Sequence, residues 1–414
     1  MQLDQRWRLA QGDDAQLLFS IDRSFAPGPP DKIGIAVSGG GDSVALLHLY
    51  LRWAAQTGHQ IAAVTVDHTL RADSAAEAAS VAVFCAENNI PHDTLKWESW
   101  DGHGNIQAAA RDARYKLMAD WARDNGIGGI ALGHTKDDSA ETFLMRLARK
   151  AGIDGLALMA RDFERFGVRW SRPLWMHRRA ELRAYLRRNT VTWFDDPSND
   201  NVDFERVRVR KARDTLGELG ITTDVLHHAG FVAGQARDAL THYTAKEAHK
   251  LLTFDRGDVL MPLAPDIPAE IVRRLRTQVV QWIGGLDYPP RLATMNNLTE
   301  GLMLEGKQTV AGCLVTLANC QLRFTREHNA VKVLTCATHE IWDKRWEISG
   351  PHEPDLHIGA LGEAVKDCPD WRDTGLPRST LLASPAIWQG DSLIAAPLAG
   401  YNPEWTARIV AEFH

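Results

Sequence analysis

Six residues near the start of the chain have the types and spacing expected of an anion-binding loop: Ser38-Gly39-Gly40-Gly41-Asp42-Ser43. A short β-branched run precedes them, and apolar residues at helical spacing follow. Successive glycines permit positive φ angles and let a ligand approach the backbone, while the first amides of a helix carry partial positive charge. The loop is therefore predicted to hold a phosphate group.

The spacing of this loop excludes the two better-known phosphate loops. A P-loop needs a lysine after its last glycine, and a dinucleotide-binding loop needs a glycine where Val44 stands. The pattern Ser-Gly-Gly-x-Asp-Ser resembles instead the loop of the ATP pyrophosphatase (PP-loop) superfamily, whose members cleave ATP between its α and β phosphates and adenylate a substrate oxygen. The resemblance implies that residues 38–43 bind ATP.

A second group of polar residues follows a buried strand predicted at residues 129–132. His134 comes first, and Asp138 and Glu141 fall within the first turn of the next helix, on the same side. In an open parallel sheet, ligands bind beyond the carboxyl ends of the strands, so both carboxylates are predicted to belong to a site. Asp137 is interpreted instead as complementing the helix dipole.

Two further segments hold polar residues at positions that suit a ligand. Residues 67–71 (Asp-His-Thr-Leu-Arg) end a strand predicted at residues 61–66. Arg111 and Arg114 share one face of a helix that begins at Asn105. By themselves the two arginines fit a solvated basic stripe as well as a contact with phosphate.

The composition becomes basic between Arg172 and Arg213, although the whole chain has a formal net charge of −6. This block holds eleven Lys or Arg against six Asp or Glu, and tryptophans such as Trp175 and Trp193 are interleaved with them. Cations mixed with aromatic rings suit contact with phosphates and stacking on bases, so the block is a candidate RNA-binding surface. A salt-bridged helix surface is the alternative.

Length and composition indicate a globular protein of about two to three domains. The 414 residues include 44% hydrophobic and 24% charged ones, which are ordinary values. No run of about 18 uncharged apolar residues occurs, so we expect a cytoplasmic protein without a membrane span. The five cysteines include no C-x-x-C pair, which argues against a zinc knuckle and a disulfide framework.

Strands and helices alternate through residue 150, which predicts an α/β fold with a doubly wound parallel sheet in a domain of residues 1–215. Residues 220–335 are expected to form a helical middle domain with a small β-hairpin sheet, and residues 341–414 a small β-rich C-terminal module. The elements predicted for the middle domain are helices at 225–250, 268–284 and 291–303 and strands at 308–317, 320–326 and 330–335.

The motifs occur in an order that resembles the bacterial tRNA(Ile)-lysidine synthetases. Besides the glycine loop, the resemblance rests on residues 67–71, 105–115 and 134–141, on Arg172-Pro173-Leu174, and on the Asp-Pro-Ser-Asn run with its spaced arginines at 196–210. It implies that the enzyme adenylates the wobble cytidine of an isoleucine tRNA with the anticodon CAU, releasing pyrophosphate. Free L-lysine then displaces AMP. ATP and Mg²⁺ are the implied cofactors.

The resemblance also implies roles for individual residues. Asp42 would hold Mg²⁺ and support the departure of pyrophosphate, Asp138 and Glu141 would grip lysine or accept its proton, and Arg111 would take part in catalysis by binding the polyphosphate or the tRNA backbone. The residues implied to bind ATP are Ser38, Gly39, Gly40, Gly41, Asp42, Ser43 and His134. Those implied to bind tRNA are Arg114, Arg206, Arg208 and Arg210. Ser139 departs from the family, which usually has Gln there.

Three other functions stay open at this point. An RNA-thiolating PP-loop enzyme would use the same ATP chemistry, but such relatives usually carry cysteine pairs. An amidotransferase related to GMP or asparagine synthetase ought to carry a glutaminase domain, and no segment resembles one. A pure RNA-binding module is the option without catalysis. The oligomeric state is also open, a homodimer included.

Methionine tRNAs share the anticodon CAU, so the anticodon alone cannot distinguish them from the isoleucine tRNA. We therefore expect residues 225–414 to contact the tRNA body and acceptor stem.

Overall fold

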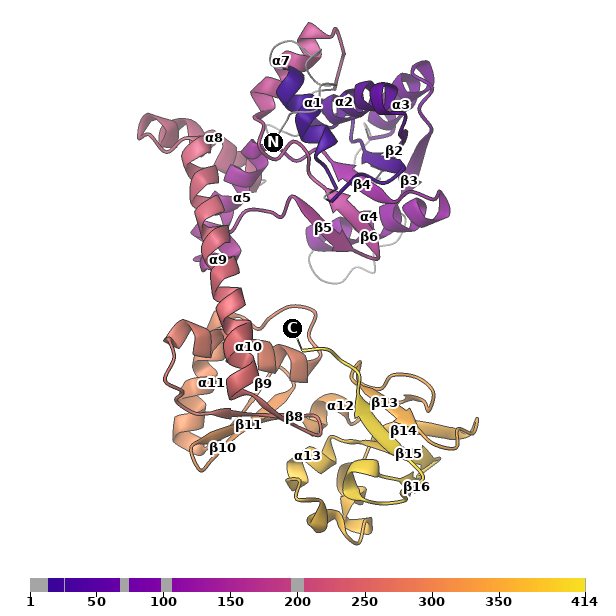
Figure 1. Ribbon diagram of the computed structural model, residues 1–414, viewed down its shortest axis with the longest axis vertical. Helices are drawn as coiled ribbons and strands as arrows, with labels where there is room; N and C mark the ends of the chain where they lie inside the picture. The colour runs from indigo at the N-terminus through magenta and orange to yellow at the C-terminus, as the bar shows by residue number, and fades with distance from the viewer. Residues whose placement is uncertain (1–13, 26, 68–73, 98–105, 195–204, 414) are drawn as a thin grey trace. The chain divides into compact units, whose positions relative to one another are not determined.

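The computed structural model describes residues 14–25, 27–67, 74–97, 106–194 and 205–413 (Figure 1). Three sequence predictions, at residues 68–71, at Asn105 and at residues 196–204, therefore lie outside the described residues. The chain forms two compact units, Met1–Arg237 and Asp238–His414. The finer division into three domains stays a prediction.

A six-stranded sheet forms the centre of the first unit, in the order β3-β2-β1-β4-β6-β5. Its strands are β1 (Lys32–Ala36), β2 (Gln60–Asp67), β3 (His92–Lys96), β4 (Gly129–Leu132), β5 (Asp162–Arg165) and β6 (Val168–Ser171). All neighbouring strands are parallel except β5 and β6. The predicted α/β fold with a parallel sheet is thus confirmed, and the glycine loop begins just beyond β1.

Helices cover both faces of this sheet, as expected of a doubly wound fold (Figure 1). Those that pack on the sheet are α1 (Asp14–Asp22), α2 (Gly41–Thr57), α3 (Ser74–Glu87), α4 (Ile106–Asp124) and α7 (Arg179–Arg188). The others are α5 (Lys136–Ala148), α6 (Ile153–Leu156), α8 (Glu205–Glu218) and α9 (Thr223–Leu251), which continues past the end of the first unit. One buried cluster joins α1, α2 and α7 to the sheet, and its members include Ile33 of β1 and Trp53 of α2. A separate cluster packs α4 against the sheet through Tyr115 and Trp170.

The hairpin of β5 and β6 was not among the predicted elements. Phe166 and Gly167 join the two strands with φ angles of 52° and 71°, which suit the twist of a two-residue hairpin turn. Each strand has only four residues, too short a pattern for its alternation to be distinguished from a loop. Because β6 lies parallel to β4, Arg172 emerges at the same edge of the sheet as His134.

The second unit begins with an antiparallel five-stranded sheet in the order β7-β8-β11-β10-β9. Its elements are β7 (Thr253–Asp255), β8 (Asp258–Pro262), α10 (Ala269–Gly284), α11 (Leu292–Glu305), β9 (Lys307–Val310), β10 (Cys313–Ala318) and β11 (Gln321–Arg326). The helices predicted at 268–284 and 291–303 match α10 and α11 closely. Apolar residues of both helices and of the sheet share one buried core.

Two strand predictions in this unit are wrong. The stretch 308–317 is not one strand but two, because Ala311 and Gly312 adopt φ angles of 49° and 74° and turn the chain. The stretch 330–335 is not a strand, since α12 (His328–Val331) occupies its start and Leu334 N donates to Val331 O in a turn. Val331 is fully buried whereas Val333 is 77% exposed, so the two valines do not share a face as strand residues two apart would.

The remaining chain is rich in short strands, as predicted. One antiparallel sheet has the order β12-β14-β15-β16, and β13 pairs with β17. These elements are β12 (Cys336–Ala337), β13 (Trp346–Ser349), β14 (Leu356–Ala360), η3 (Gly362–Asp367), η4 (Trp371–Thr374), α13 (Arg378–Leu382), β15 (Pro385–Gln389), β16 (Ser392–Ala395), η5 (Pro397–Ala399) and β17 (Thr406–Ile409). No helix in the described part of the chain has the length and apolar character that a membrane span requires.

Candidate active site

The glycine loop between β1 and α2 is closed by its two serines. Ser38 N donates to Ser43 Oγ at 3.1 Å, the two hydroxyl oxygens are 3.2 Å apart, and Ser43 Oγ donates to Gly40 O at 2.9 Å. Gly39 has a φ of 84°, which favours glycine. Helix α2 begins at Gly41, and the first amides of a helix have no acceptor within it. The loop suits an anion, and its binding of ATP stays a prediction.

The end of β4 approaches this loop closely. A Cβ atom at Gly133 would lie 3.1 Å from Ser43 Cα and 3.2 Å from Ser43 N, so the approach depends on glycine. Because β1 and β4 are parallel neighbours, His134 and helix α5 emerge at the same edge of the sheet as the loop. The structure thus brings together the two groups of polar residues that the sequence singled out.

Two carboxylates in the first turn of α5 have structural partners. Asp138 Oδ2 accepts hydrogen bonds from Thr135 N and Thr135 Oγ1, both at 2.8 Å, and Asp138 N donates back to Thr135 Oγ1, which completes a capping box. Asp137 accepts from Arg179 N and from Arg213 Nη2, each at 2.8 Å. The helix-dipole interpretation of Asp137 is therefore incomplete, because its side chain also fixes two arginines.

Arg179, the first residue of α7, links three carboxylates. Its Nε donates to Asp42 Oδ2 at 2.9 Å, its Nη2 to Asp138 Oδ1 at 3.2 Å, and its Nη1 to Glu141 Oε1 at 3.3 Å. Each nitrogen of the planar guanidinium thus meets a different carboxylate. The acidic residues of the glycine loop and of α5 therefore form one cluster with Arg179 at its centre.

Glu141 is fully buried, and arginines surround it. Besides Arg179, Arg210 Nε donates to Glu141 Oε1 at 3.1 Å, and Arg206 Nε lies 3.4 Å from Oε2. Arg213 Nη1 is 3.7 Å from Oε1. A buried carboxylate needs partners of this kind to offset its loss of hydration. Helices α7 and α8 supply them.

Asp42 and Asp138 differ in acidity. Burial raises the pKa of Asp42 above its ordinary value, against the opposing effect of the Arg179 charge. Burial acts in the same direction on Asp138, but there the Arg179 charge and the hydrogen bond from the Thr135 amide help to bring the pKa below its ordinary value. Asp138 is therefore an anion at neutral pH, and a further cation near Asp42 would favour the charged form of that carboxyl.

His134 is held as a neutral ring. Arg172 Nε donates to His134 Nδ1 at 3.2 Å, so the ring proton resides on Nε2. Burial lowers the pKa of His134 to about 3, and the Arg172 charge acts in the same direction. Arg172 is itself anchored, because it donates to Ala160 O and its Cζ lies 4.2 Å from the centroid of the Phe163 ring. His134 can thus donate a hydrogen bond from Nε2 to an oxygen of a ligand.

Arg111 and Arg114 of α4 share an aromatic neighbour. Their Cζ atoms lie 5.4 Å and 5.9 Å from the centroid of the Tyr115 ring. Arg111 is exposed, whereas Arg114 Nε is buried and has no hydrogen-bond partner among the described residues. Burial lowers the pKa of Arg114. Arg111 is therefore accessible to a ligand from solvent, and Arg114 lies deeper beside it.

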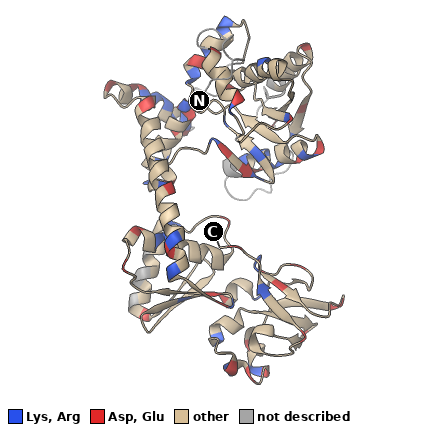
Figure 2. Cartoon of the chain, in the orientation of Figure 1, with Lys and Arg blue, Asp and Glu red and all other residues tan. Residues whose placement is uncertain are grey.

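The arginines of α8 do not all point the same way. Arg206, Arg210 and Arg213 recur at helical spacing, and all three contact carboxylates of α5. Arg208 is exposed and lies on another side of the helix. Acidic and basic residues are mixed where α5 and α8 pack together (Figure 2). Arg206 and Arg210, both predicted to bind tRNA, therefore already contact Glu141 inside the protein.

A metal site made by the protein alone is absent from the part of the chain that the structure describes, since no three His, Cys, Asp or Glu side chains there are grouped to hold an ion. Magnesium often takes only one or two protein carboxylates, because substrate phosphates and water supply the other ligands. Asp42 Oδ1 suits that arrangement, being buried without a hydrogen-bond partner among the described residues. Its role toward Mg²⁺ stays a prediction.

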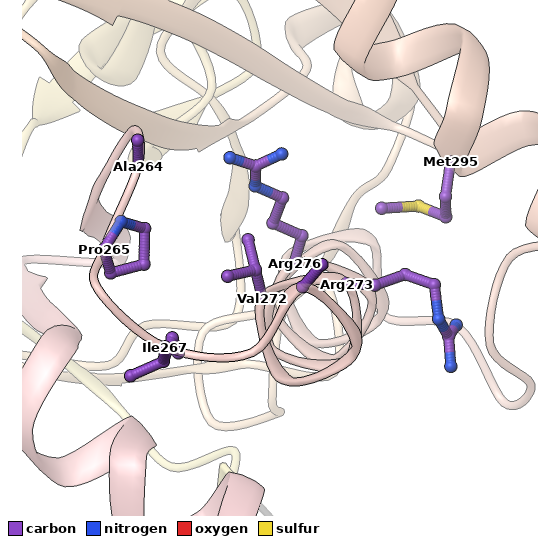
Figure 3. A pocket seen from close by; sticks show the side chains of 8 residues that line it. Ala264, Pro265, Ile267, Val272, Arg273, Arg276 and Met295 are labelled. Atoms are coloured by element: carbon purple, nitrogen blue, oxygen red, sulfur yellow. The ribbon is translucent and has the colours of Figure 1, made fainter.

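The surface of the described residues is hollowed near the glycine loop and again in the second unit. The hollow near the glycine loop has a volume of about 160 Å³ and is lined by Val37, Gly39, Val44, Leu47, Ser80, Val81, Phe84, Thr192, Trp193 and Phe194. The hollow in the second unit has a volume of about 450 Å³ and lies beside α10. Arg276 of α10 and Met295 of α11 line it (Figure 3). Arg276 Nη2 donates there to Leu263 O at 2.6 Å. The second hollow lies within the stretch 225–414 expected to contact tRNA, but none of the individual residues predicted for catalysis, ATP binding or tRNA binding lines it.

Sequence reasoning missed the part that Arg179 and Arg213 play in the site. Both were included in the basic block between Arg172 and Arg213, where composition alone suggested contact with RNA. Only the packing of α7 against α2 and of α8 against α5 brings these two side chains to the carboxylates. One signal was available: three acidic residues within five positions of a helix start, if buried, need cations from elsewhere in the chain.

Comparisons with known proteins show which proteins this chain is similar to. A protein-family model described as a PP-loop domain matches residues 14–213. The tRNA(Ile)-lysidine synthase of Ruegeria pomeroyi is 44% identical over 396 residues, which cover 95% of this chain and 94% of that protein. The corresponding protein of Rhodopseudomonas palustris is 37% identical and covers 75% and 93%. A U34-tRNA thiolase structure from Methanococcus maripaludis is 16% identical, with a TM-score of 0.45 over 55% of this chain and 77% of that one, too distant to bear on function.

Proposed function

Because this chain belongs to the tRNA(Ile)-lysidine synthase family, we propose that it ligates free L-lysine to the wobble cytidine of the isoleucine tRNA with the anticodon CAU. ATP adenylates the carbonyl oxygen of the base with release of pyrophosphate, and the side-chain amine of lysine then displaces AMP. The observation that supports this most directly is the meeting of the glycine loop with the carboxylates of α5 through Arg179.

The adenylation step makes its main demand on the leaving pyrophosphate, which carries much negative charge. The amides at the start of α2, the hydroxyls of Ser38 and Ser43 and the Nε2 proton of His134 are donors suited to it. Asp42 would hold Mg²⁺ through Oδ1, and the ion would supply further compensation of the phosphate charge. Arg111 is exposed at the same edge and can bind the polyphosphate or the tRNA backbone.

The lysine step requires a binding site for the positively charged lysine side chain and a group that accepts a proton from its amine. Glu141 Oε2 is buried, has no hydrogen-bond partner among the described residues, and faces Arg206 at 3.4 Å. Both oxygens of Asp138 are already engaged, by Thr135 and by Arg179. We therefore assign Glu141 to direct contact with lysine and Asp138 to support of that contact.

The tRNA would be bound by both units. Arg114, Arg206, Arg208 and Arg210 are proposed to contact its phosphates near the anticodon, with Arg208 exposed in the absence of RNA. Residues 238–414 are proposed to contact the tRNA body and acceptor stem through backbone and shape. A tRNA-modifying enzyme of this kind would act in the cytoplasm, and a homodimer stays a prediction.

Pyrophosphate exchange and lysine incorporation together test this function. We expect ATP/pyrophosphate exchange that requires tRNA, and transfer of labelled lysine to isoleucine tRNA with the anticodon CAU. Exchange accompanied by sulfur transfer would support an RNA-thiolating enzyme instead, and exchange with a small acceptor and an amine donor would support an amidotransferase. Binding of tRNA without any exchange would indicate an RNA-binding module.

The Asp42→Ala variant tests the metal role within the same assays. It should fold normally and lose turnover, because the buried carboxylate at the mouth of the loop is removed. A folded Asp42→Ala protein that adenylates tRNA at the wild-type rate would rule out this role for Asp42.

A further inference from the structure

The carboxylates that serve the two proposed half-reactions come from different parts of the fold. Asp42 lies at the end of the glycine loop, and Asp138 and Glu141 lie on α5. Nearby carboxylates repel one another, and the charge of Asp138 indeed acts to raise the pKa of Asp42. Something must therefore hold the two groups at a fixed spacing.

Arg179 meets all three carboxylates while its own backbone is anchored. Its amide nitrogen donates to Asp137 Oδ2 at 2.8 Å. The turn before it is tied to the start of α5, since Lys136 N donates to His177 O at 2.8 Å. The Arg179 side chain is only 18% exposed. Both the backbone and the guanidinium of Arg179 are thus fixed by hydrogen bonds, so the side chain has little freedom to change partners.

Asp42 and Glu141, the two carboxylates proposed to contact the metal and lysine, each have one oxygen that Arg179 does not contact. Arg179 takes Oδ2 of Asp42 and Oε1 of Glu141, and the other oxygens, Asp42 Oδ1 and Glu141 Oε2, are the buried ones without hydrogen-bond partners among the described residues. An unsatisfied buried carboxylate oxygen is costly and therefore rare. Arg179 holds one oxygen of each carboxylate, together with Arg210 at Glu141 Oε1, and so helps to fix the direction in which the other oxygen points.

We propose that Arg179 is a positioning residue for both half-reactions, which orients Asp42 toward the metal-bound nucleotide and Glu141 toward lysine. The proposal rests on the proposed lysine ligation. It assigns Arg179 no contact with substrate, and it makes the planar three-way fork of the side chain, rather than its charge alone, the feature that matters. A lysine at this position has one ammonium group and cannot reach three carboxylates in fixed directions.

Two substitutions at Arg179 separate geometry from charge. Arg179→Met removes the charge and keeps the approximate length, and Arg179→Lys keeps the charge and removes the fork. Arg52→Met serves as the matched control, because Arg52 is also a half-buried arginine in a two-partner contact, with Asp14 and Tyr185, but lies three turns along α2 from the loop. Each full-length protein is measured for thermal unfolding, for tRNA-dependent pyrophosphate exchange and for lysine transfer with separate kcat and KM values.

We expect Arg179→Met to lower kcat in both half-reactions by about 100-fold, the cost of a misplacement of about 1 Å, and to raise the KM for lysine about 10-fold. Arg179→Lys should recover less than a tenth of the lost kcat. The control should lower the melting temperature with unchanged KM values. A purely structural role of Arg179 would likewise move the melting temperature alone.

Two results would overturn the proposal: full rescue of kcat and KM by Arg179→Lys, which would leave charge as the whole effect, or wild-type kinetics in a folded Arg179→Met protein. If Arg179→Met does not fold, the kinetics of Arg179→Lys decide alone. The wild-type protein keeps the two hypotheses apart, because failure of wild-type lysine transfer contradicts the proposed function, whereas wild-type activity with unaffected variants contradicts only the role of Arg179.

Discussion

Arg172 Nε donates a hydrogen bond to His134 Nδ1 at 3.2 Å, across the ends of the neighbouring parallel strands β6 and β4. Arg172 cannot accept a proton from the ring, so this contact selects the neutral tautomer that carries its proton on Nε2. It also opposes protonation of His134, in addition to the effect of burial. The histidine proposed to meet the phosphate chain is therefore a neutral donor across the physiological pH range.

This tautomer predicts a particular dependence of stability on pH. His134 has a folded-state pKa of about 3, below its ordinary value of 6.5, so the unfolded chain binds a proton first as the pH falls. The contribution of the neutral ring is complete above about pH 6.5 and is lost toward pH 3, by at most about 1.4 kcal/mol per pH unit. Denaturant unfolding of wild type and His134→Asn at pH 7.5, 6.5, 5.5 and 4.5 should therefore show the wild type losing more stability on acidification.

Comparison of the two proteins cancels the other histidines whose pKa values burial also lowers, such as His48, His92 and His177. A stability difference between wild type and His134→Asn that is constant from pH 7.5 to 4.5 would contradict the assignment.

Asp138 and Glu141 should respond differently to loss of their charge. Asp138→Asn weakens a capping box and one contact of Arg179, so we expect a loss of about 1 kcal/mol in the free energy of unfolding together with reduced activity. Glu141→Gln should leave tRNA-dependent pyrophosphate exchange measurable and reduce lysine transfer at least 100-fold, with a raised lysine KM. Asp120→Asn, at an exposed carboxylate of α4, provides the control. Equal effects of Asp138→Asn and Glu141→Gln on lysine KM would contradict this division.

The arginines of α8 should separate in salt-dependence experiments. Log K for tRNA binding should fall linearly with log salt, and loss of one phosphate contact should reduce the slope by about 0.7 to 0.9. Arg208→Gln should reduce the slope without altering lysine KM, because helical spacing places this exposed residue on another side of α8 from Arg206 and Arg210. Arg206→Gln and Arg210→Gln should change lysine KM as well, since both contact Glu141.

Arg123→Gln, at an exposed arginine near the end of α4, should leave the slope unchanged. If the Arg206/Arg208/Arg210→Gln triple variant binds tRNA with the wild-type salt slope, α8 is not a tRNA-binding surface.

The sequence was sufficient to predict the parallel sheet and the position of the glycine loop, because both depend on local patterns. The buried runs at β1, β2 and β4 and the three glycines specify strand, turn and helix within about twenty residues. The local pattern also placed Asp138 and Glu141 just after the end of β4. The glycine loop and this strand end were expected to lie close together, because parallel strands finish at one edge of a sheet.

The central position of Arg179 could not be predicted in this way. It lies 137 residues from Asp42, and nothing in the local pattern around Arg178 and Arg179 shows which of the two faces inward. In the structure Arg178 pairs with Asp224, and Arg179 binds the carboxylates of the glycine loop and α5. Which distant side chain compensates a buried charge depends on tertiary packing. The composition of the block therefore placed both arginines on the predicted RNA-binding surface.

The last prediction concerns selection between isoleucine and methionine tRNAs, which share the anticodon CAU in the family's substrates. A unit of about 237 residues has an expected radius of gyration of about 17 to 18 Å, too small to reach from an anticodon to an acceptor stem. We therefore expect residues 238–414 to supply the discrimination.

A truncated protein must keep the start of α9 to test this prediction. Asp224 pairs with Lys136, and Gly230 O accepts from Leu158 N at 3.2 Å, so an end near Gly220 would remove contacts of the first unit. A protein ending at Arg237 retains them. It should bind ATP and adenylate tRNA weakly, but incorporate lysine into isoleucine and methionine transcripts at similar rates, whereas the full-length protein should strongly prefer the isoleucine transcript. A soluble 1–237 protein that discriminates as well as the intact chain would place selection in the catalytic unit.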